Sequence, residues 1–339
     1  YSSPVQITGA GWHSIKGQGA GNSVMATKTD GTLWSWGYGR FGAMIDSTGD
    51  PTQRSSPTQI PGTTWKHGMI SDYTSMAVKT DNTLWSWGRN TYGVLGQNSR
   101  TYYSSPVQIP GTTWSTHING FCSHSARSMA IKTDGTLWVM GENEAGSLGL
   151  NQATSTTISS PTQIPGTTWS QIAGDSMSPM ALKTDGTLWA WGNNDKGNLG
   201  QNNKTAYSSP VQVPGTNWVT ITHGSRVKGA TKTDGTLWTW GFNELGQLGH
   251  NNETNYSSPV QVPGTNWAFM ITGYHNDGHY TQAVKTDGTL WAWGRNDKGQ
   301  AGQNNLTLYS SPVQIPGTTW NTTVQGHTTN TLSFYNMKS

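Results

Sequence analysis

A short polar segment near the C-terminus carries the residues best suited to bind a metal ion. In His275-Asn-Asp-Gly-His279 the side chains of His275, Asp277 and His279 alternate, so an extended backbone would bring all three to one side. Two imidazoles and a carboxylate are ligands that zinc and other transition metals accept. The alternative is a polar loop in which Asp-Gly forms a turn. Three ligands without a fourth favour that alternative, and we expect no metal and no cofactor.

Hydrolytic chemistry finds even less support in the sequence. There is no nucleophile-elbow motif and no paired-carboxylate motif. Six aspartates share one context, because each belongs to a Lys-Thr-Asp segment, and these segments begin at Lys28, Lys79, Lys132, Lys183, Lys232 and Lys285. A residue that recurs in every copy is expected to build the fold, so these aspartates are predicted to shape turns. We therefore expect a protein that is not an enzyme.

These segments mark an internal repeat. Each opens a run close to Lys-Thr-Asp-Gly-Thr-Leu-Trp-x-Trp-Gly, and the run restarts every 49 to 53 residues. A period of about 51 residues is too long for most helical solenoids and fits one blade of a β-propeller. Residues 1–339 are therefore predicted to form one all-β propeller domain, and function is to be sought in what differs between the repeats.

Each unit predicts four short strands, which in the fourth repeat cover 169–174, 179–183, 187–192 and 208–213. In the third strand Leu188 and Ala190 alternate with Trp189 and Trp191. Large side chains on both faces are typical of a sheet packed between two neighbours. Asp-Gly between the second and third strands predicts a two-residue type I′ hairpin turn. Asn82 takes the place of the glycine in the second repeat, and Asn also tolerates a left-handed backbone.

The repeat count predicts seven blades, of which the last is incomplete. Seven strand-opening Trp residues and seven Ser-Ser-Pro segments occur, but only six Leu-Trp third strands. The chain thus starts at a fourth strand, residues 2–7, and stops after a second strand at 332–335. We expect the N-terminal strand to complete a composite last blade and so to close the ring. A ring of six blades is the second choice.

Composition narrows the classes of function. Charged residues make up 11% of the chain, the net charge is +3, and no cluster of Lys and Arg stands out, so nucleic-acid binding is not expected. No run of about 18 apolar residues occurs, so membrane insertion is not expected. The single Cys122 excludes an internal disulfide. A surface rich in Asn, Ser, Thr and Gln favours an extracellular, cell-surface or virion location. The first residue, Tyr1, suggests a removed leader or a piece of a longer protein.

The motif Gly-x-Asn-x-x-Gly-x-Leu-Gly follows the third strand and is clearest at 241–249. With the Pro-Val segment and Trp that come next, it makes essentially the whole chain resemble the regulator-of-chromosome-condensation repeat family. The resemblance implies a seven-bladed propeller, but it says much less about function. The eukaryotic namesake is a guanine-nucleotide exchange factor that docks on chromatin, and similar bacterial propellers inhibit β-lactamases. Near-identical repeats of this kind also resemble those of bacterial and viral surface proteins.

The loops between first and second strands vary most among the repeats. We expect them to project on one face around the axial channel, with the Gly-x-Asn loops on the opposite face. Aromatic, Arg and His side chains gather in them, and such residues dominate binding hot spots. The candidate binding residues are Tyr73, Phe121, His124, Arg127, Arg226, Tyr274, His275 and His279. Alanine at Arg127 or Tyr274 is expected to weaken binding and leave the fold intact. Relaxed constraint on loop tips explains the variation equally well.

Together these observations favour a non-enzymatic binding or structural propeller of a virion or microbial surface. Its variable loops would meet a protein or glycan partner, in an oligomer or larger assembly if one forms. The alternative is a soluble regulatory propeller of exchange-factor or enzyme-inhibitor type. An enzyme is a distant third.

Overall fold

Six antiparallel sheets make up the described part of the molecule. The structure, a computed structural model, describes residues 7, 9–18, 23–39, 52–71, 73–124, 126–152, 155–174, 177–224, 226–273, 279–320 and 322 of the 339 residues. Within these ranges 24 strands follow one another, four to a sheet: β1 (Trp12–Gln18), β2 (Ser23–Lys28), β3 (Leu33–Gly39), β4 (Thr52–Ile60); β5 (Trp65–Ile70), β6 (Thr74–Lys79), β7 (Leu84–Gly88), β8 (Tyr103–Gln108); β9 (Phe121–Ser123), β10 (Arg127–Ile131), β11 (Leu137–Glu142), β12 (Thr157–Ile164); β13 (Trp169–Ala173), β14 (Met180–Lys183), β15 (Leu188–Gly192), β16 (Tyr207–Gln212); β17 (Trp218–His223), β18 (Val227–Lys232), β19 (Leu237–Gly241), β20 (Tyr256–Gln261); β21 (Trp267–Thr272), β22 (Tyr280–Lys285), β23 (Leu290–Gly294), β24 (Tyr309–Ile315). A short 3-10 turn, η1 (Glu144–Gly146), follows β11. The predicted all-β propeller is confirmed.

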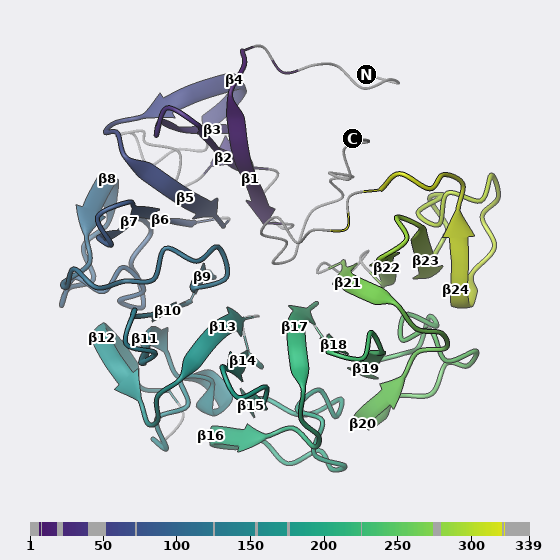
Figure 1. Ribbon diagram of the computed structural model, residues 1–339. Helices are drawn as coiled ribbons and strands as arrows, with labels where there is room; N and C mark the ends of the chain where they lie inside the picture. Colours follow the sequence, from purple (N-terminus) through teal and green to yellow (C-terminus); the bar gives the residue numbers. More distant parts are fainter. Residues whose placement is uncertain are drawn as a thin grey trace.

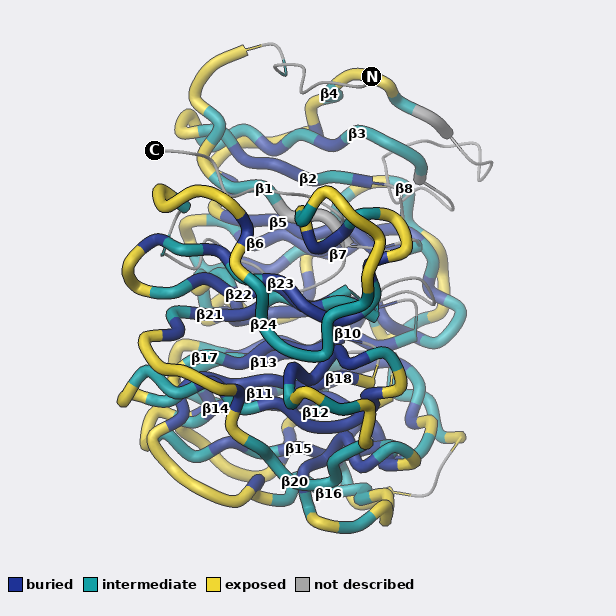
Figure 2. The backbone as a smooth tube through the Cα atoms, turned by 90° about the vertical axis from the view of Figure 1, so that its right-hand side faces the viewer, coloured by how far each residue is buried: buried dark blue, intermediate teal, exposed yellow. Residues whose placement is uncertain are grey.

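The six sheets are the first to sixth blades, and they stand around a common centre (Figure 1). In each blade the first strand lies nearest the centre and the fourth lies at the rim. Because neighbouring strands are antiparallel, the turns between second and third strands share one face with the connections into the next blade. We call this the hairpin face; it carries Asp185 and the five equivalent aspartates. The other two kinds of loop lie on the loop face, which carries Tyr73 and Arg226. Figure 2 shows burial along the strands and exposure in many of the connections. No helix in the described ranges is long and apolar enough to cross a membrane.

Each blade buries both faces of its third strand, as the alternation in sequence predicts. In β15, Leu188 and Ala190 pack in one cluster with Trp218 of the fifth blade. On the other face Trp191 donates its indole N–H to the carbonyl oxygen of Ser147 in the third blade, at 2.9 Å. The alternation therefore serves two interfaces, one with each neighbour.

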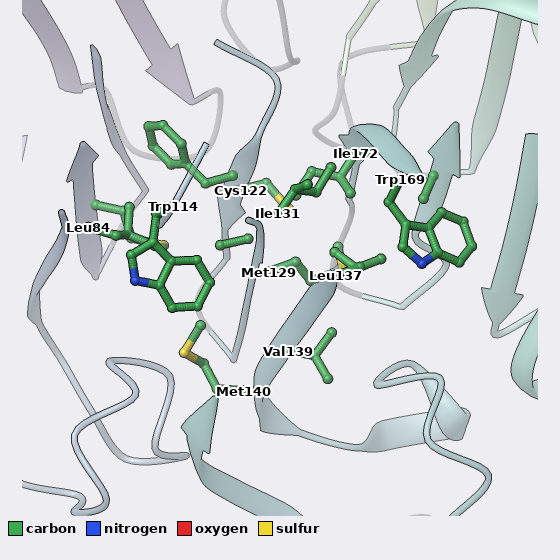
Figure 3. Packing of buried hydrophobic residues seen from close by; sticks show 14 of the residues in the cluster. Leu84, Trp114, Cys122, Met129, Ile131, Leu137, Val139, Met140, Trp169 and Ile172 are labelled. Atoms are coloured by element: carbon green, nitrogen blue, oxygen red, sulfur yellow. The ribbon is translucent and has the colours of Figure 1, made fainter. Parts of the chain in front are cut away.

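Figure 3 shows how the third blade packs between the second and the fourth. Leu137 and Val139 of β11 are fully buried and lie between the indoles of Trp114 and Trp169. The fixed alanine of the fourth blade's second strand, Ala181, joins this same cluster. A small side chain at that place allows the close approach of two sheets, because interiors pack without voids.

The repeated lysine lies between two indole rings. Lys183 Nζ is 4.7 Å from the ring centroid of Trp169 and 4.6 Å from that of Trp189, within the range of a cation–π contact. The two rings meet edge to face with their centroids 6.2 Å apart. The other five blades hold their lysines in the same way. The repeated Lys and Trp residues therefore build the blade.

The Asp-Gly turn is not the predicted type I′ turn. Type I′ requires positive φ at both central residues, whereas Gly186 has a φ of 76° and Asp185 does not have a positive φ. Gly186 N–H donates to Lys183 O at 3.1 Å, so a β-turn is followed by a left-handed glycine in a three-residue hairpin loop. The side chain of Asp185 stabilises this turn, because its Oδ1 accepts from the hydroxyl of Thr187 at 2.7 Å and from the backbone amide of Thr187 at 2.9 Å. The hydroxyl first, and then the amide, lowers the pKa of Asp185. The predicted turn-shaping role of the aspartates is confirmed.

A buried asparagine organises each Gly-x-Asn loop. Asn243 is fully buried, and its amide group donates to Asn252 O at 3.0 Å and Thr254 O at 2.9 Å. Its side-chain oxygen accepts from the amide of Leu248 at 2.8 Å. Only a side chain with both donor and acceptor can make these bonds, which explains why Asn recurs in the motif.

On the hairpin face, adjacent blades are joined by a backbone hydrogen bond from each strand-opening Trp to the preceding turn. Trp169 N–H donates to Gly135 O at 2.9 Å, and Trp218 N–H donates to Gly186 O at 3.0 Å. The same bond occurs once more beyond the sixth blade, where Trp320 N–H donates to Gly288 O at 3.1 Å. The chain therefore enters a seventh blade in the way it enters the others.

On the loop face, a glycine of the Gly-x-Asn loop in the second to fifth blades touches the fourth strand of the next blade. A Cβ atom on Gly246 would lie 2.6 Å from Ser310 Cα, and Asn251 N–H donates to Ser310 O at 2.8 Å. The same pair of contacts joins the preceding blades at Gly93, Gly146 and Gly197, each time to the first serine of the fourth strand. These contacts join adjacent blades on the loop face, as the Trp amide bonds do on the hairpin face. We call each of these two sets of contacts a seam.

The sixth blade has the residues for this seam, but the described chain does not fill it. Gly299 keeps a φ of 77°, yet no described atom lies within 4 Å of where its Cβ would be. The matching residue in the repeat is Ser2 of Tyr1-Ser-Ser-Pro, which lies outside the described residues, as does the second strand predicted at 332–335. Among the described strands, no close packing joins β1–β4 to β21–β24. We therefore predict that residues 1–7 pair with the edge at Gly299 and Asn304.

Deleting residues 1–8 should lower the melting temperature of the whole ring, because it opens the closing seam and exposes two packed faces. Circular dichroism melting of the full and shortened chains measures this. An unchanged melting temperature would contradict closure.

A second variant makes the test specific to the seam. Gly299→Val should destabilise the full chain more than the chain without residues 1–8. Backbone strain at positive φ is common to both, but only the full chain would also suffer a collision with Ser2. Equal losses in the two chains would show that residues 1–8 do not lie against Gly299.

The turn can be tested at Gly186. Gly186→Val should cost about 1–2 kcal/mol, because a β-branched residue resists the left-handed region. Gly186→Asn should cost less, since Asn82 adopts a φ of 65° at the equivalent site. Denaturant unfolding of both variants checks this, and equal losses would argue against the left-handed turn.

Candidate functional site

The two kinds of loop that the sequence places on opposite faces lie on the same face. The hairpin reverses the chain, so the third strand returns to the face from which the second strand started, and the predicted separation is wrong. The residue after each third-strand glycine donates its amide to the residue just before the second strand: Arg89 to Tyr73 at 2.8 Å, Glu142 to Ala126 at 2.8 Å, Asn193 to Met177 at 2.9 Å, Phe242 to Arg226 at 3.0 Å and Arg295 to His279 at 2.7 Å. In the second to sixth blades, the same backbone hydrogen bond thus joins residues whose side chains differ from blade to blade.

In the second blade, Tyr73 and Arg89 form a pair on the loop face. The Arg89 guanidinium carbon lies 5.1 Å from the centroid of the Tyr73 ring. Arg89 Nε donates to the hydroxyl of Thr91 at 2.8 Å, and Thr91 is within 2.6 Å of the hydroxyl of Tyr102, which is 45% exposed. A fixed guanidinium and two aromatic rings therefore border the loop face here.

In the third blade, the predicted binding residues lie inside the protein. Phe121 is 1% exposed and belongs to the main apolar cluster, and His124 is 7% exposed with its ring 6.4 Å from that of His223. Arg127 is 4% exposed; its Nε donates to Glu142 O at 2.7 Å, and its guanidinium lies 3.7 Å from the carboxylate of Glu144. These three side chains pack inside the loops, and the burial of Arg127 leads us to predict that its truncation harms the fold.

The fourth, fifth and sixth blades share a continuous group of side chains. Arg226 and Asp195 are paired at 3.9 Å, and both side chains remain about half exposed. Lys196 Nζ lies 5.6 Å from the ring of Phe242, whose centroid is 5.4 Å from that of His279. We call these five residues the cross-blade cluster.

The sixth blade contributes one more ion pair to the loop face. Arg295 contacts Asp297 at 2.6 Å, and this bond, followed by that from Gln300, lowers the pKa of the Asp297 carboxyl. Of the three residues considered as metal ligands only His279 lies among the described residues; His275 and Asp277 lie outside them, as does the candidate binding residue Tyr274. Within the described ranges no three His, Cys, Asp or Glu side chains are placed to hold a metal ion.

The cross-blade cluster contains three residues that the sequence did not single out: Asp195, Lys196 and Phe242. Their signal was present in the repeats. The second position of Gly-x-Asn, where Phe242 stands, reads Tyr38, Arg89, Glu142, Asn193, Phe242 and Arg295. This position varies as much as the loops between first and second strands, but its place inside a regular motif concealed it.

Comparison with known families places the chain among repeat propellers. The regulator of chromosome condensation (RCC1) repeat matches residues 81–126, 185–227, 234–272 and 287–328, which together make up half of the chain. Among curated proteins, the Protein RCC2 homolog of Xenopus laevis is 28% identical over 130 residues, 38% of this chain. The ultraviolet-B receptor UVR8 of Arabidopsis thaliana is 28% identical over 188 residues, 54% of this chain and 42% of the receptor. The chain spans about a quarter of the length of the RCC2 homolog, and 4% of the E3 ubiquitin-protein ligase HERC2 of Mus musculus, to which it is 26% identical over 191 residues.

Solved structures agree on the fold. Prp20p from Saccharomyces cerevisiae superposes with a TM-score of 0.74 at 18% identity, covering 91% of this chain and 77% of its own; its structure is described together with binding to Gsp1p and histones. Human WBSCR16 superposes with a TM-score of 0.73 at 19% identity, covering 94% and 85%. At these identities the likeness shows the fold alone.

Arg127 and Arg226 are both candidate binding residues in the sequence, but Arg127 is buried and Arg226 is half exposed. Arg127→Ala should lower the free energy of unfolding by about 2–3 kcal/mol, because it removes a buried charge-assisted bond to Glu142. Arg226→Ala, at a half-exposed site, should change it by no more than about 0.5 kcal/mol. Denaturant unfolding of both variants measures the difference, and a stable Arg127→Ala variant would contradict the anchoring role.

Proposed function

Because the chain belongs to the regulator of chromosome condensation (RCC1) repeat family, we propose that it is a regulatory propeller that binds a partner protein through its loop face. The observation that carries this proposal is the cross-blade cluster. Three of its members, Arg226, Phe242 and His279, lie at positions where the repeats differ, although the backbone beneath these positions makes the same hydrogen bond in the second to sixth blades. The framework therefore does not explain these side chains.

The chemistry of the cluster suits a protein interface. Arg226 offers planar donors at a half-exposed site and is only loosely paired with Asp195. Phe242 is itself 9% exposed and packs between Lys196 and His279, so it fixes these two polar side chains at the surface that a partner would meet. Arg and aromatic residues supply most hot spots, and a rigid scaffold lowers the entropy lost on binding.

A protein that is similar in fold, Prp20, also binds other proteins. Prp20 is described as binding Gsp1p and histones and is seen bound to Kap60. This supports a protein partner and the regulatory alternative over a structural role. Ligase activity is not part of the proposal, because the chain covers 4% of HERC2, and we propose a non-enzymatic module.

A virion, cell-surface or other extracellular setting, with a glycan as partner, is a separate and weaker proposal. It rests on the polar, weakly charged composition, in which charged residues make up 11% of the chain. The curated relatives include a receptor and ubiquitin ligases, and their names give this setting no support.

The test compares the two faces. Proteins captured by the immobilised chain from a lysate of the source organism are identified, and the partner is purified and titrated against the variants. Arg226→Ala and Lys196→Ala should each weaken binding by about 1–3 kcal/mol if they are hot spots. Lys66→Ala is the matched control, since it removes an exposed positive charge near the start of β5, on the hairpin face.

If Lys66→Ala abolishes binding while both loop-face variants bind like the wild type, the proposed face is wrong. If no protein is retained at a defined stoichiometry, the proposal of a protein-binding propeller fails.

A further inference from the structure

A cavity on the hairpin face does not follow the repeat. It has a volume of about 650 Å³, and its lining includes His13 and Ser14 of the first blade, His67 of the second, and Ser115 and His117 of the third. The innermost strands of these three blades lie side by side around the centre in Figure 1. Three of the nine histidines of the chain therefore meet at one place.

An insertion in the third blade builds one wall of this cavity. In the fourth blade Trp169 and Ile172 are separated by two residues, and Ile172 pairs with Ala181. In the third blade the equivalent partners of the second strand are Trp114 and Phe121, with six residues between them. The four additional residues leave the sheet before β9 begins, so the cavity is absent from a regular blade.

The inserted segment is held in one conformation by its own hydrogen bonds. Gly120 N–H donates to His117 O at 2.9 Å, and His117 N–H donates to the hydroxyl of Ser115 at 3.2 Å. Asn119 ties the segment to the next blade, since its carbonyl accepts from Ile172 N–H at 3.0 Å. His117 is therefore presented from a fixed turn, which is the condition for a preformed site.

The lining offers many groups that form hydrogen bonds. His13 and His67 are nearly parallel, with ring centroids 6.1 Å apart and planes at 18°. Besides the three imidazoles, the described lining has the hydroxyls of two serines and two threonines and one apolar side chain, Ile118; none of the described lining residues is Lys, Arg, Asp or Glu. Imidazoles and hydroxyls both donate and accept hydrogen bonds. No Lys or Arg among the described lining residues would pair with an anion. Within the described ranges no three His, Cys, Asp or Glu side chains are placed to hold a metal ion.

We propose that this cavity binds a neutral carbohydrate of one or two sugar rings. Its volume is in the range of small-molecule sites. Hydroxyls of a sugar can pair with both imidazoles and side-chain hydroxyls, while Ile118 meets the carbon-bound face of the ring. The site is independent of the loop face, so either proposal can fail without the other.

The test uses four defined probes on the full chain: D-glucose, N-acetyl-D-glucosamine, maltose and inorganic phosphate. Saturation-transfer NMR and isothermal titration should show binding of at least one sugar at millimolar concentration and none of phosphate. His13→Ala and His117→Ala, both at exposed positions, should each weaken that sugar roughly fivefold to tenfold, the effect of losing one hydrogen bond.

Val219→Ala is the matched control, because Val219 follows the strand-opening Trp218 as His13 follows Trp12, and it lies outside the cavity. It should bind the sugar like the wild type. The proposal is overturned if none of the three sugars binds, if phosphate binds instead, or if both histidine variants bind with unchanged affinity.

Discussion

The ring depends on one constraint: adjacent sheets must come close enough for backbone to bond to backbone at both ends of each interface. On the hairpin face the amide of each strand-opening Trp donates to the turn before it. On the loop face a glycine touches the backbone of the fourth strand in the next blade. There is no room for a Cβ atom at Gly93, Gly146, Gly197 and Gly246. Glycine at these places, alanine in the second strand and tryptophan between the sheets are one solution to a single packing problem. Any larger side chain at a seam would separate two blades and expose both.

This constraint divides the residues into two groups. The repeated Lys, Asp, Trp, Asn and Gly residues build the blade: the Asp and Asn side chains are hydrogen-bonded within it, the Lys and Trp side chains pack against one another, and the glycines allow close contact at a seam. Side chains that the seams do not fix are left for recognition, and they lie in two places. One is the loop face, where the same backbone bond carries Tyr73, Arg226 or His279. The other is the cavity on the hairpin face, where the third blade departs from the repeat.

Much of the fold can be predicted from the sequence because the same strand and turn residues recur from repeat to repeat. Strand positions, two-sided burial and the entry into a seventh blade at Trp320 were predictable from periodicity alone. The turn type was not, because Asp185 Oδ1 bonds to Thr187 and keeps Asp185 itself out of the left-handed region. The site was less predictable still. Variation among repeats marks positions that the frame leaves free only if they are exposed, and Phe121 and Arg127 vary while buried. Phe242 was missed because its variable position stands inside a regular motif.

The most direct test of the account is amide hydrogen exchange at the loop-face seam. Four asparagine amides, those of Asn98, Asn151, Asn202 and Asn251, donate to a serine carbonyl of the next blade at 2.7–2.8 Å. If one seam joins every pair of neighbours, including the closing pair, the amide of Asn304 must be protected to a similar degree by Ser2. Exchange of Asn304 at the rate of an open loop, with the other four protected, would contradict the account.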